Sequence, residues 1–210
     1  MTIEKDFFRQ VMGQFTTGVT VVTTRSHEEL AGLTVNSFTS VSLDPPLILI
    51  CVDLYSTALP FIRASGTFAI NILTSEQEAL SRCFATTSEE RYEYFCHASY
   101  HIAATGAPIL DGALAFIDSR IVAEYPGGDH AIFLAQVVAM GTDGRTAFAS
   151  AADQEQSNLT ELNIYEAGES NFRYLKDQKA PLVYYRSQYR HLARDYQRPS
   201  LAAYYDEDFE

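Results

Sequence analysis

The chain has 210 residues, of which 47% are hydrophobic, and its formal net charge at pH 7 is −12. A chain of this length and composition can bury one good core, so we expect a single domain over residues 1–210. The acidic balance argues against a nucleic-acid-binding surface, which needs clustered lysine and arginine. It also means that a phosphate-bearing ligand must be held by local hydrogen-bond donors rather than by a general positive field.

The composition of the N-terminus and the number of cysteines lead us to expect a cytoplasmic protein. Residues 1–6 carry acids and no apolar stretch of the kind found in signal peptides. The longest apolar runs are about the length of a strand, so we expect no membrane span. Three cysteines, an odd number, do not suggest a disulfide framework, and we expect reduced thiols in the cytoplasm.

The first predicted elements are a helix and a β-hairpin. Apolar residues recur at helical spacing over residues 7–15. Residues 20–24 consist of β-branched side chains only and predict a strand. The polar turn at residues 26–29 then returns the chain, so the second arm of the hairpin runs into the segment that begins at Gly32.

The most informative stretch covers residues 32–47 and reads G-L-T-V-N-S-F-T-S-V-S-L-D-P-P-L. Its polar side chains are all small until Asp44, so a flat, phosphate-bearing ligand can approach the backbone closely and form hydrogen bonds there. Pro45 and Pro46 remove two donors from the strand ladder and are expected to end the strand. Residues 47–52 are apolar and predict a fully buried strand.

A helix is predicted to follow this strand. Ser56 is its candidate N-cap, so free backbone N–H groups and the hydroxyls of Ser56 and Thr57 would together form an anion site. Gly66 is expected to end the helix, and residues 68–73 alternate like a strand. Residues 75–78 predict a capping box ahead of a second helix.

The remaining predicted structure is mainly β. Residues 113–125, 131–140 and 181–186 predict strands, and residues 126–129 a turn between the first two. Strands joined by hairpins and short helices, without regular β–α alternation, favour an antiparallel barrel.

Residues 142–180 are longer than an ordinary connection between two strands and predict a helical insertion. Asp153 is the candidate cap of its first helix, and Leu159, Leu162 and Tyr165 would form an apolar face. We expect this insertion to lie across the barrel or a partner subunit, with its acids facing a basic stripe further along the chain.

The run over residues 32–47 closely resembles the signature of the flavin reductase family, small split-barrel proteins that reduce free flavin with NAD(P)H. The resemblance continues through Ser56 and Thr57, residues 68–73 and 82–85, Arg91, Gly112, and residues 128–130 and 181–186. It implies a mainly β fold with short helices and an antiparallel split β-barrel of the FMN-binding type. The exposed strand edges of so small a barrel, together with 13 Phe and 13 Tyr, favour a homodimer. The resemblance also implies FMN or FAD as the flavin, NADH with NADPH as an alternative, and a flavin-dependent monooxygenase as the partner that receives reduced flavin.

The resemblance assigns a flavin site position by position. The wall along the isoalloxazine edge and ribityl chain is assigned to Thr34, Val35, Asn36 and Ser37, and its continuation to Ser40, Cys51 and Val52. The phosphate contacts are assigned to Ser56 and Thr57. The residues expected to close over the flavin are Phe84 and Arg91, and Tyr185 is a further candidate contact. The family usually has Phe after the basic residue of the last closing motif, whereas Tyr92 follows Arg91 here.

His130 is the candidate catalytic residue. Its place at the start of a predicted strand resembles the family position beside the nicotinamide. An imidazole there would orient the carboxamide or stabilise charge that develops on the reduced flavin. Hydride transfer needs no base on the protein, but it needs nicotinamide C4 held at roughly 3–3.5 Å from flavin N5. The alternative is an ordinary surface histidine.

Two further clusters carry residues capable of binding a ligand. Cys83, Cys96, His97 and His101 suggest a metal site, but no Cys-x-x-Cys pair supports one, and we expect no bound metal. Arg186, Arg190, Arg194 and Arg198 are spaced four apart. On a helix the last three would form a basic stripe, which is either a solvated face or a site for a nucleotide or a partner.

Two alternative functions stay open from the sequence alone. The first is an oxidase that resembles the pyridoxamine-phosphate oxidases, and the second is a flavin-binding or electron-transfer protein without NAD(P)H turnover. The residues do not decide between FMN and FAD or between NADH and NADPH, and they do not identify the partner oxygenase.

Overall fold

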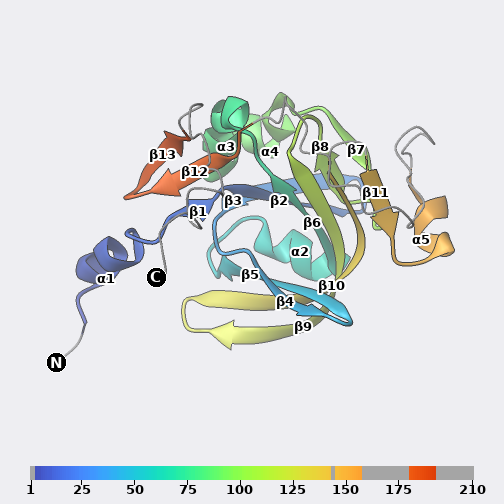
Figure 1. Ribbon diagram of the computed structural model, residues 1–210, viewed down its shortest axis with the longest axis horizontal. Helices are drawn as coiled ribbons and strands as arrows, with labels where there is room; N and C mark the ends of the chain where they lie inside the picture. Colours follow the sequence, from blue (N-terminus) through green and yellow to red (C-terminus); the bar gives the residue numbers. More distant parts are fainter. Residues whose placement is uncertain (1–2, 143–144, 158–179, 193–210) are drawn as a thin grey trace, which may run out of the picture.

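The structure is a computed structural model that describes residues 3–142, 145–157 and 180–192. The helices are α1 (Lys5–Met12), α2 (Leu59–Ser65), α3 (Glu78–Ala85), α4 (Glu89–Tyr92) and α5 (Ala151–Glu155), with 3-10 turns η1 (Ser75–Gln77) and η2 (Phe95–His97). The strands are β1 (Thr17–Gly18), β2 (Thr20–Ser26), β3 (Glu29–Val35), β4 (Thr39–Leu43), β5 (Pro46–Asp53), β6 (Thr67–Ile72), β7 (Tyr100–Ile102), β8 (Pro108–Leu110), β9 (Ala115–Gly127), β10 (His130–Thr142), β11 (Arg145–Phe148), β12 (Leu182–Tyr185) and β13 (Gln188–His191). The predicted fold class, mainly antiparallel β with short helices, is confirmed (Figure 1).

The largest sheet runs in the order β3-β2-β6-β9-β10-β5-β4, with β11 paired to β10. β3 and β4 are consecutive in the chain but lie at opposite edges of this sheet. Residues 36–38 alone connect them, and such a connection spans at most about 14 Å. The sheet must therefore curl until its two edges approach each other, which is the geometry expected of a split barrel.

The interior of the curled sheet holds the main hydrophobic core. Ile50, Ile70 and Phe133 come from three different strands and are almost fully buried, and Leu59 and Ile62 of α2 pack among them. α2 therefore stabilises the curled sheet from within.

The prediction that residues 47–52 form a fully buried strand is only half right. Ile48, Ile50 and Val52 are in the core, whereas Leu47, Leu49 and Cys51 are half-buried. A strand in the wall of a barrel points alternate side chains inward and outward. The outward side chains of β5 are apolar too, so the sequence does not show the alternation. Pro45 lies between β4 and β5, and the strand break predicted there is confirmed.

The helix after β5 begins later than predicted. Its N-cap is Ala58 rather than Ser56. The Ser56 hydroxyl instead accepts a hydrogen bond from the Ala58 backbone N–H at 3.3 Å, so Ser56 shapes the turn that precedes the helix. Gly66 ends the helix in the left-handed conformation, with φ of 66°, as predicted.

Two other helix caps are displaced from their predicted positions. The capping box expected at residues 75–78 is formed one residue earlier by Thr74 and Gln77. The helix expected to be capped by Asp153 is α5, and its N-cap is Ser150. The Ser150 hydroxyl accepts from the Asp153 N–H, and the Gln77 side chain accepts from the Thr74 N–H. Sequence spacing alone does not choose between adjacent cap candidates.

The beginning of the long segment 142–180 is attached to the barrel. β11 pairs with β10, and Asp153 of α5 accepts a hydrogen bond from Arg120 at 2.8 Å. Hydrogen bonds from Ser150 and Arg120 hold the pKa of Asp153 below its usual value. The apolar face predicted for Leu159, Leu162 and Tyr165 lies outside the described residues.

The expectation of reduced thiols is wrong for two of the three cysteines. Cys83 of α3 and Cys96 of η2 form a disulfide, and Cys51 is free. The chain reverses between α3 and η2 and brings the two Cα atoms to 6.0 Å, within the range that a disulfide requires. An odd number of cysteines gave no indication of this pairing. The part of the chain that the structure describes contains no cluster of three or more metal-ligating side chains.

Over the same described ranges, the structure has no helix that is both long and apolar enough to cross a membrane.

A second sheet, in the order β1-β12-β13, lies beside α3 (Figure 1). Arg190 belongs to strand β13, so the basic stripe predicted on a helix is wrong at this residue. Arg194 and Arg198 lie outside the described residues.

Asp118 in β9 gives a prediction about pH. Burial raises the pKa of this carboxyl to about 6, although hydrogen bonds from the Thr105 hydroxyl and backbone N–H oppose the shift. A raised acid pKa stabilises the fold below the unfolded-state value near 3.9, and this contribution is lost as the pH rises through 6. Asparagine does not titrate, so we expect Asp118→Asn to lack this pH-dependent loss of stability. The urea midpoint of the variant should therefore rise relative to that of the wild type as the pH goes from 4 to 7. A constant difference between the two proteins over this range would contradict the prediction.

Candidate functional site

The predicted site residues gather where the two edges of the sheet approach each other. Thr34 and Val35 end β3, and Asn36 and Ser37 cross from one edge to the other. The Ser37 hydroxyl donates to the Cys51 carbonyl at 2.8 Å and accepts from the Cys51 N–H at 3.1 Å. Ser37 thus takes the place of a strand partner for β5 at this point. Its hydroxyl fixes the crossing chain and leaves the exposed Asn36 side chain beside it for a ligand.

The turn assigned to the flavin phosphate follows β5 directly. The Asp53 side chain accepts a hydrogen bond from the Tyr55 N–H at 2.7 Å, and the Asp53 carbonyl accepts one from Ser56 at 2.9 Å. The Leu54 N–H donates to the Asp129 carbonyl at 3.1 Å. The turn is therefore attached to the β9–β10 hairpin as well as to β5.

His130 begins β10 next to this turn. It is the register partner of Asp53 in β5 and of Gly127 in β9. Its Nδ1 lies 2.7 Å from the Asp129 carboxylate, and this hydrogen bond lowers the pKa of Asp129. A carboxylate at Nδ1 favours the proton on that nitrogen and leaves Nε2 as the ring nitrogen that Asp129 does not engage. The imidazole is 41% exposed and is accessible at the rim of the site.

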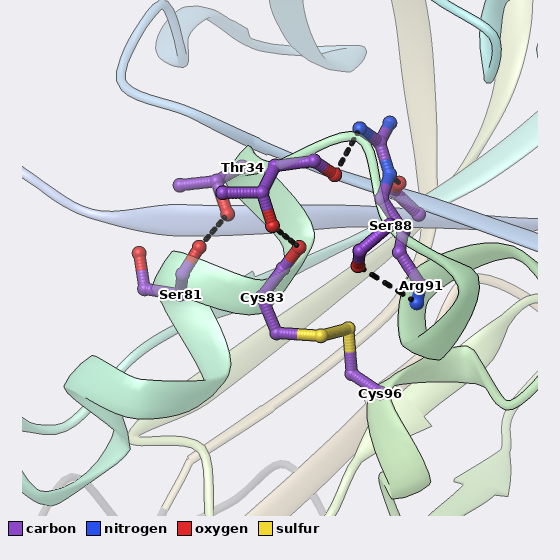
Figure 2. The surroundings of a disulfide bond; sticks show 8 residues. Thr34, Ser81, Cys83, Ser88, Arg91 and Cys96 are labelled. Carbon is purple, nitrogen blue, oxygen red and sulfur yellow. Dashed lines mark hydrogen bonds between the residues drawn. A yellow bond between two sulfur atoms is a disulfide. The ribbon is translucent and has the colours of Figure 1, made fainter.

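Arg91 braces the cover that α3 and α4 form over β3. Its Nε donates to the Gly32 carbonyl at 2.9 Å and its Nη1 to the Thr86 carbonyl at 3.2 Å. Figure 2 shows Arg91 in the surroundings of the Cys83–Cys96 disulfide, with its guanidinium pointing away from the two sulfurs, and Thr34, whose hydroxyl donates to the Ser81 carbonyl. Burial lowers the pKa of Arg91. The side chain therefore holds backbone segments together beneath the site rather than reaching across its surface.

Tyr92 links the cover to the phosphate turn. The Thr57 hydroxyl donates to the Tyr92 hydroxyl at 3.2 Å, and hydrogen bonds from Thr57 and Thr87 lower the pKa of Tyr92. The family usually has Phe at this position, and Phe has no hydroxyl that could form this hydrogen bond. The sequence departure at Tyr92 thus adds a polar contact to the phosphate turn.

Two predicted site residues belong to the core rather than to the exposed wall. They are Val52 and Phe84, and the Phe84 ring packs edge-on against Phe95 at 5.1 Å. A Cβ on Gly32 would lie 2.6 Å from the Phe84 ring, so glycine permits this close packing. The prediction that Phe84 closes over the flavin therefore does not agree with the structure.

Ser40 and Tyr185 are not among the residues that line the two pockets containing Asn36. Ser40 is exposed on β4. Tyr185 is half-buried beneath the Arg186 guanidinium, at 5.2 Å. Its neighbour Tyr184 lies on the opposite face of β12 and lines a pocket instead. A shift of one residue in a strand thus separates a pocket residue from a surface residue.

Two pockets flank the crossing chain, and both include Asn36. One has a volume of about 470 Å³ and is lined by residues 15–18 together with Thr20, Asn36, Phe38, Thr39 and Ile72. The other has a volume of about 200 Å³ and is lined by Val19, Thr34, Val35, Asn36, Ala85, Tyr184 and Tyr189. Sequence reasoning missed Tyr189 and chose Tyr185 instead of its neighbour Tyr184, because a sequence does not show which face of a strand meets a pocket.

Small hydroxyls, an exposed amide and accessible backbone lie at the split of the barrel, with an oriented histidine beside them. This arrangement suits a flavin-binding oxidoreductase that holds a flat ring against the backbone. The flavin reductase like domain family matches residues 12–193, and the chain belongs to this family. The protein is therefore an oxidoreductase of the flavin reductase type.

Individual relatives agree with this assignment. The chain is 36% identical over 135 residues to the reductase subunit HsaB of a flavin-dependent monooxygenase from Mycobacterium tuberculosis, covering 64% of this chain and 71% of that protein. It is 43% identical over 132 residues to an NADH-dependent FAD reductase from Streptomyces globisporus, covering 62% and 72%. The crystal structure of nitrilotriacetate monooxygenase component B from Mycobacterium thermoresistibile has a TM-score of 0.73 at 28% identity, covering 93% and 90%.

Proposed function

We propose that this flavin reductase transfers a hydride from NADH to FMN or FAD bound at the split of the barrel. One observation carries the proposal: the end of β3 with the crossing residues that follow it (34–37), the turn 53–57 and His130 are joined by hydrogen bonds into one surface. The names of relatives support NADH as the reductant and either flavin as the acceptor. Flavin supplies the redox chemistry, and the protein supplies binding and orientation.

The residues divide the work of orientation. Ser37, bonded to Cys51 through both its donor and acceptor, holds the crossing backbone in place for the isoalloxazine edge. The hydroxyls of Ser56 and Thr57 provide neutral donors for a phosphate in a protein of net charge −12. His130, oriented by Asp129, is placed to position the nicotinamide or to stabilise negative charge on the reduced flavin.

The reduced flavin passes to a separate flavin-dependent monooxygenase. The reductase subunit from Mycobacterium tuberculosis and the flavin reductase component of a bacterial two-component tryptophan halogenase support this role. An open site serves such a transfer, since the reduced product must leave before it reacts in the partner. The match over residues 12–193 supports a single domain that includes the segment 142–180.

A homodimer is also part of the proposal. Helix α1 buries none of its residues and exposes Phe7, Phe8, Val11 and Met12 by more than half. Figure 1 shows α1 standing apart from the sheets. A contiguous exposed apolar face of this kind is typical of an interface, and a second copy of the chain is the occupant that closed symmetry supplies.

We expect sedimentation of the wild type to give twice the chain mass and the double variant Phe8→Glu, Val11→Glu to sediment as a monomer. Both substituted side chains are exposed in the single chain, so the variant should keep its fold, as circular dichroism can verify. A wild type that sediments as a monomer at working concentration would rule out the dimer.

The reaction itself is tested by steady-state NADH oxidation with FMN, FAD and riboflavin in parallel. Turnover with added flavin separates a reductase from a flavin-binding protein without NAD(P)H turnover. Oxidation of pyridoxine phosphate in place of NADH oxidation would favour the oxidase alternative and overturn the proposal.

A further inference from the structure

The phosphate turn uses much of its own backbone hydrogen-bonding capacity within the protein. The Tyr55 N–H donates to the Asp53 carboxylate at 2.7 Å, and the Ser56 N–H donates to the Asp53 carbonyl at 2.9 Å. The Leu54 N–H donates to the Asp129 carbonyl at 3.1 Å. None of these N–H groups is free to bind a phosphate, so recognition at this turn depends largely on hydroxyl donors.

The hydroxyl proton of Thr57 is already directed at another side chain. It is donated to the Tyr92 hydroxyl at 3.2 Å. A hydroxyl has one proton, so in this arrangement Thr57 cannot also donate to a ligand. The Tyr92 oxygen accepts from Thr57 and keeps its own proton for donation. Within residues 3–142, 145–157 and 180–192, no side chain or backbone group accepts that proton.

The surroundings of the Tyr92 hydroxyl make it a strong donor. Hydrogen bonds from Thr57 and Thr87 lower the pKa of Tyr92, and the positive charge of Arg91 adds to this effect. The Arg91 guanidinium lies over the Tyr92 ring at 5.3 Å. A phenol that releases its proton more readily also donates a stronger hydrogen bond to an anion. The buried charge of Arg91 therefore acts on the phosphate turn through Tyr92.

Tyr92 is held in place by the cover. It is the last residue of α4, and its N–H donates to the carbonyl of the N-cap residue Ser88 at 3.2 Å. The Cys83–Cys96 disulfide closes the loop that contains α4. Tyr92 is nevertheless 43% exposed, so a ligand at the phosphate turn can reach it. A fixed donor of this kind loses little conformational entropy when it binds a ligand.

We propose that the Tyr92 hydroxyl binds the flavin, by donating a hydrogen bond to the phosphate next to the ribityl chain. This inference rests on the proposed function. Thr57 and Arg91 are positioning residues that act through Tyr92, the first on its hydroxyl and the second on its ring. The family usually has Phe at this position, so the donor is a feature of this chain. It favours FMN and FAD over riboflavin, which has no phosphate.

The test uses the variant Tyr92→Phe, which removes the hydroxyl and keeps the ring over which Arg91 lies. The matched control is Tyr94→Phe, since Tyr94 lies in the same disulfide-closed loop and is also about half exposed, but its ring stacks on His97 at 5.3 Å. Dissociation constants for FMN, FAD and riboflavin are measured by flavin fluorescence. The urea midpoint of each variant shows whether its fold is kept.

We expect Tyr92→Phe to weaken FMN and FAD by about 10-fold, as for loss of a hydrogen bond to a charged group, and riboflavin by less than about twofold. Tyr94→Phe should bind all three flavins like the wild type. Equal losses for phosphorylated flavins and riboflavin would make Tyr92 a support of the fold and overturn the inference. Unchanged FMN and FAD binding would overturn it as well.

A double variant tests the arrangement of the two hydroxyls. If Thr57 acts through Tyr92, the variant Thr57→Val, Tyr92→Phe should bind FMN no more weakly than Tyr92→Phe alone. A further loss of the same size would show that Thr57 contacts the phosphate itself, and would contradict the positioning role.

Failure of the proposed function has a different result. In that case the wild type would reduce no flavin. A wild type that reduces flavin but binds FMN and riboflavin equally tightly would overturn the role of Tyr92 and leave the reductase proposal intact.

Discussion

Replacing His130 with alanine should lower the turnover of flavin reduction by about 10-fold or more while flavin affinity changes by less than about twofold. The imidazole sits at the rim of the site, next to the phosphate turn, and Asp129 fixes its orientation through Nδ1. An oriented polar group at a reacting centre contributes mainly to the transition state, so its loss appears in turnover more than in ground-state binding. Stopped-flow reduction and flavin fluorescence titration measure the two quantities.

A matched control is available in the same chain. His101 also pairs through Nδ1 with an aspartate, Asp111, at 2.9 Å, but it lies in β7 away from the split of the barrel. His101→Ala should therefore leave turnover close to the wild-type value. If His130→Ala weakened flavin binding as much as turnover, His130 would be a residue of the flavin site or of the fold, and its assigned role would be wrong.

Removing the Cys83–Cys96 disulfide should lower the free energy of unfolding by about 3 kcal/mol. The two residues are 13 positions apart. A cross-link that closes a loop of this size lowers the conformational entropy of the unfolded chain enough to stabilise the fold by that amount. The closed loop contains Arg91 and Tyr92, which brace the cover and the phosphate turn. We therefore also expect weaker flavin binding when the loop is opened.

The double variant Cys83→Ser, Cys96→Ser provides the measurement. Its urea midpoint should fall below that of the oxidised wild type, and a dithiol reductant should shift the wild type but not the variant. Thiol titration of the unfolded, unreduced wild type should find one free thiol, that of Cys51. Three free thiols, with no effect of the reductant, would contradict the disulfide.

The sequence predicted much of the fold because its signals are local. The β-branched strands, the proline pair after β4, and Gly66 each determine their own conformation, and the structure confirms all three. The curl of the sheet follows from the short connection 36–38 between edge strands, which only the pairing order reveals. The resemblance to a known family supplied that architecture in advance, whereas residue patterns favoured no more than an antiparallel barrel.

The errors arise where partners distant in the sequence decide the outcome. Cys83 and Cys96 pair because a chain reversal brings them together, and no spacing rule predicted it. Phe84 of helix α3 turns into the core because Gly32 of strand β3 leaves room for its ring. Arg190 fits a helical spacing by coincidence, since pairing with β12 makes its segment a strand.

The pocket formed by Tyr184 and Tyr189 beside Asn36 was beyond sequence reasoning for the same reason. Tyr189 meets Ser81 across 108 positions of the chain, and the two segments carry no shared motif. Within a strand, the choice of face is equally hard to predict: Tyr184 lines a pocket, while Tyr185 does not. A motif assigns a stretch to a site, but only the register shows which of two neighbouring side chains faces the ligand.

The most direct test of the central claim is anaerobic mixing of the wild-type protein with oxidised flavin and a limiting amount of NADH. Without oxygen to recycle the product, the loss of oxidised-flavin absorbance reports hydride transfer alone. We predict that one flavin is reduced for each NADH consumed, and that the same mixture without protein reacts far more slowly. Flavin binding without any loss of this absorbance, with NADH or with NADPH, would contradict the assignment of this chain as a flavin reductase.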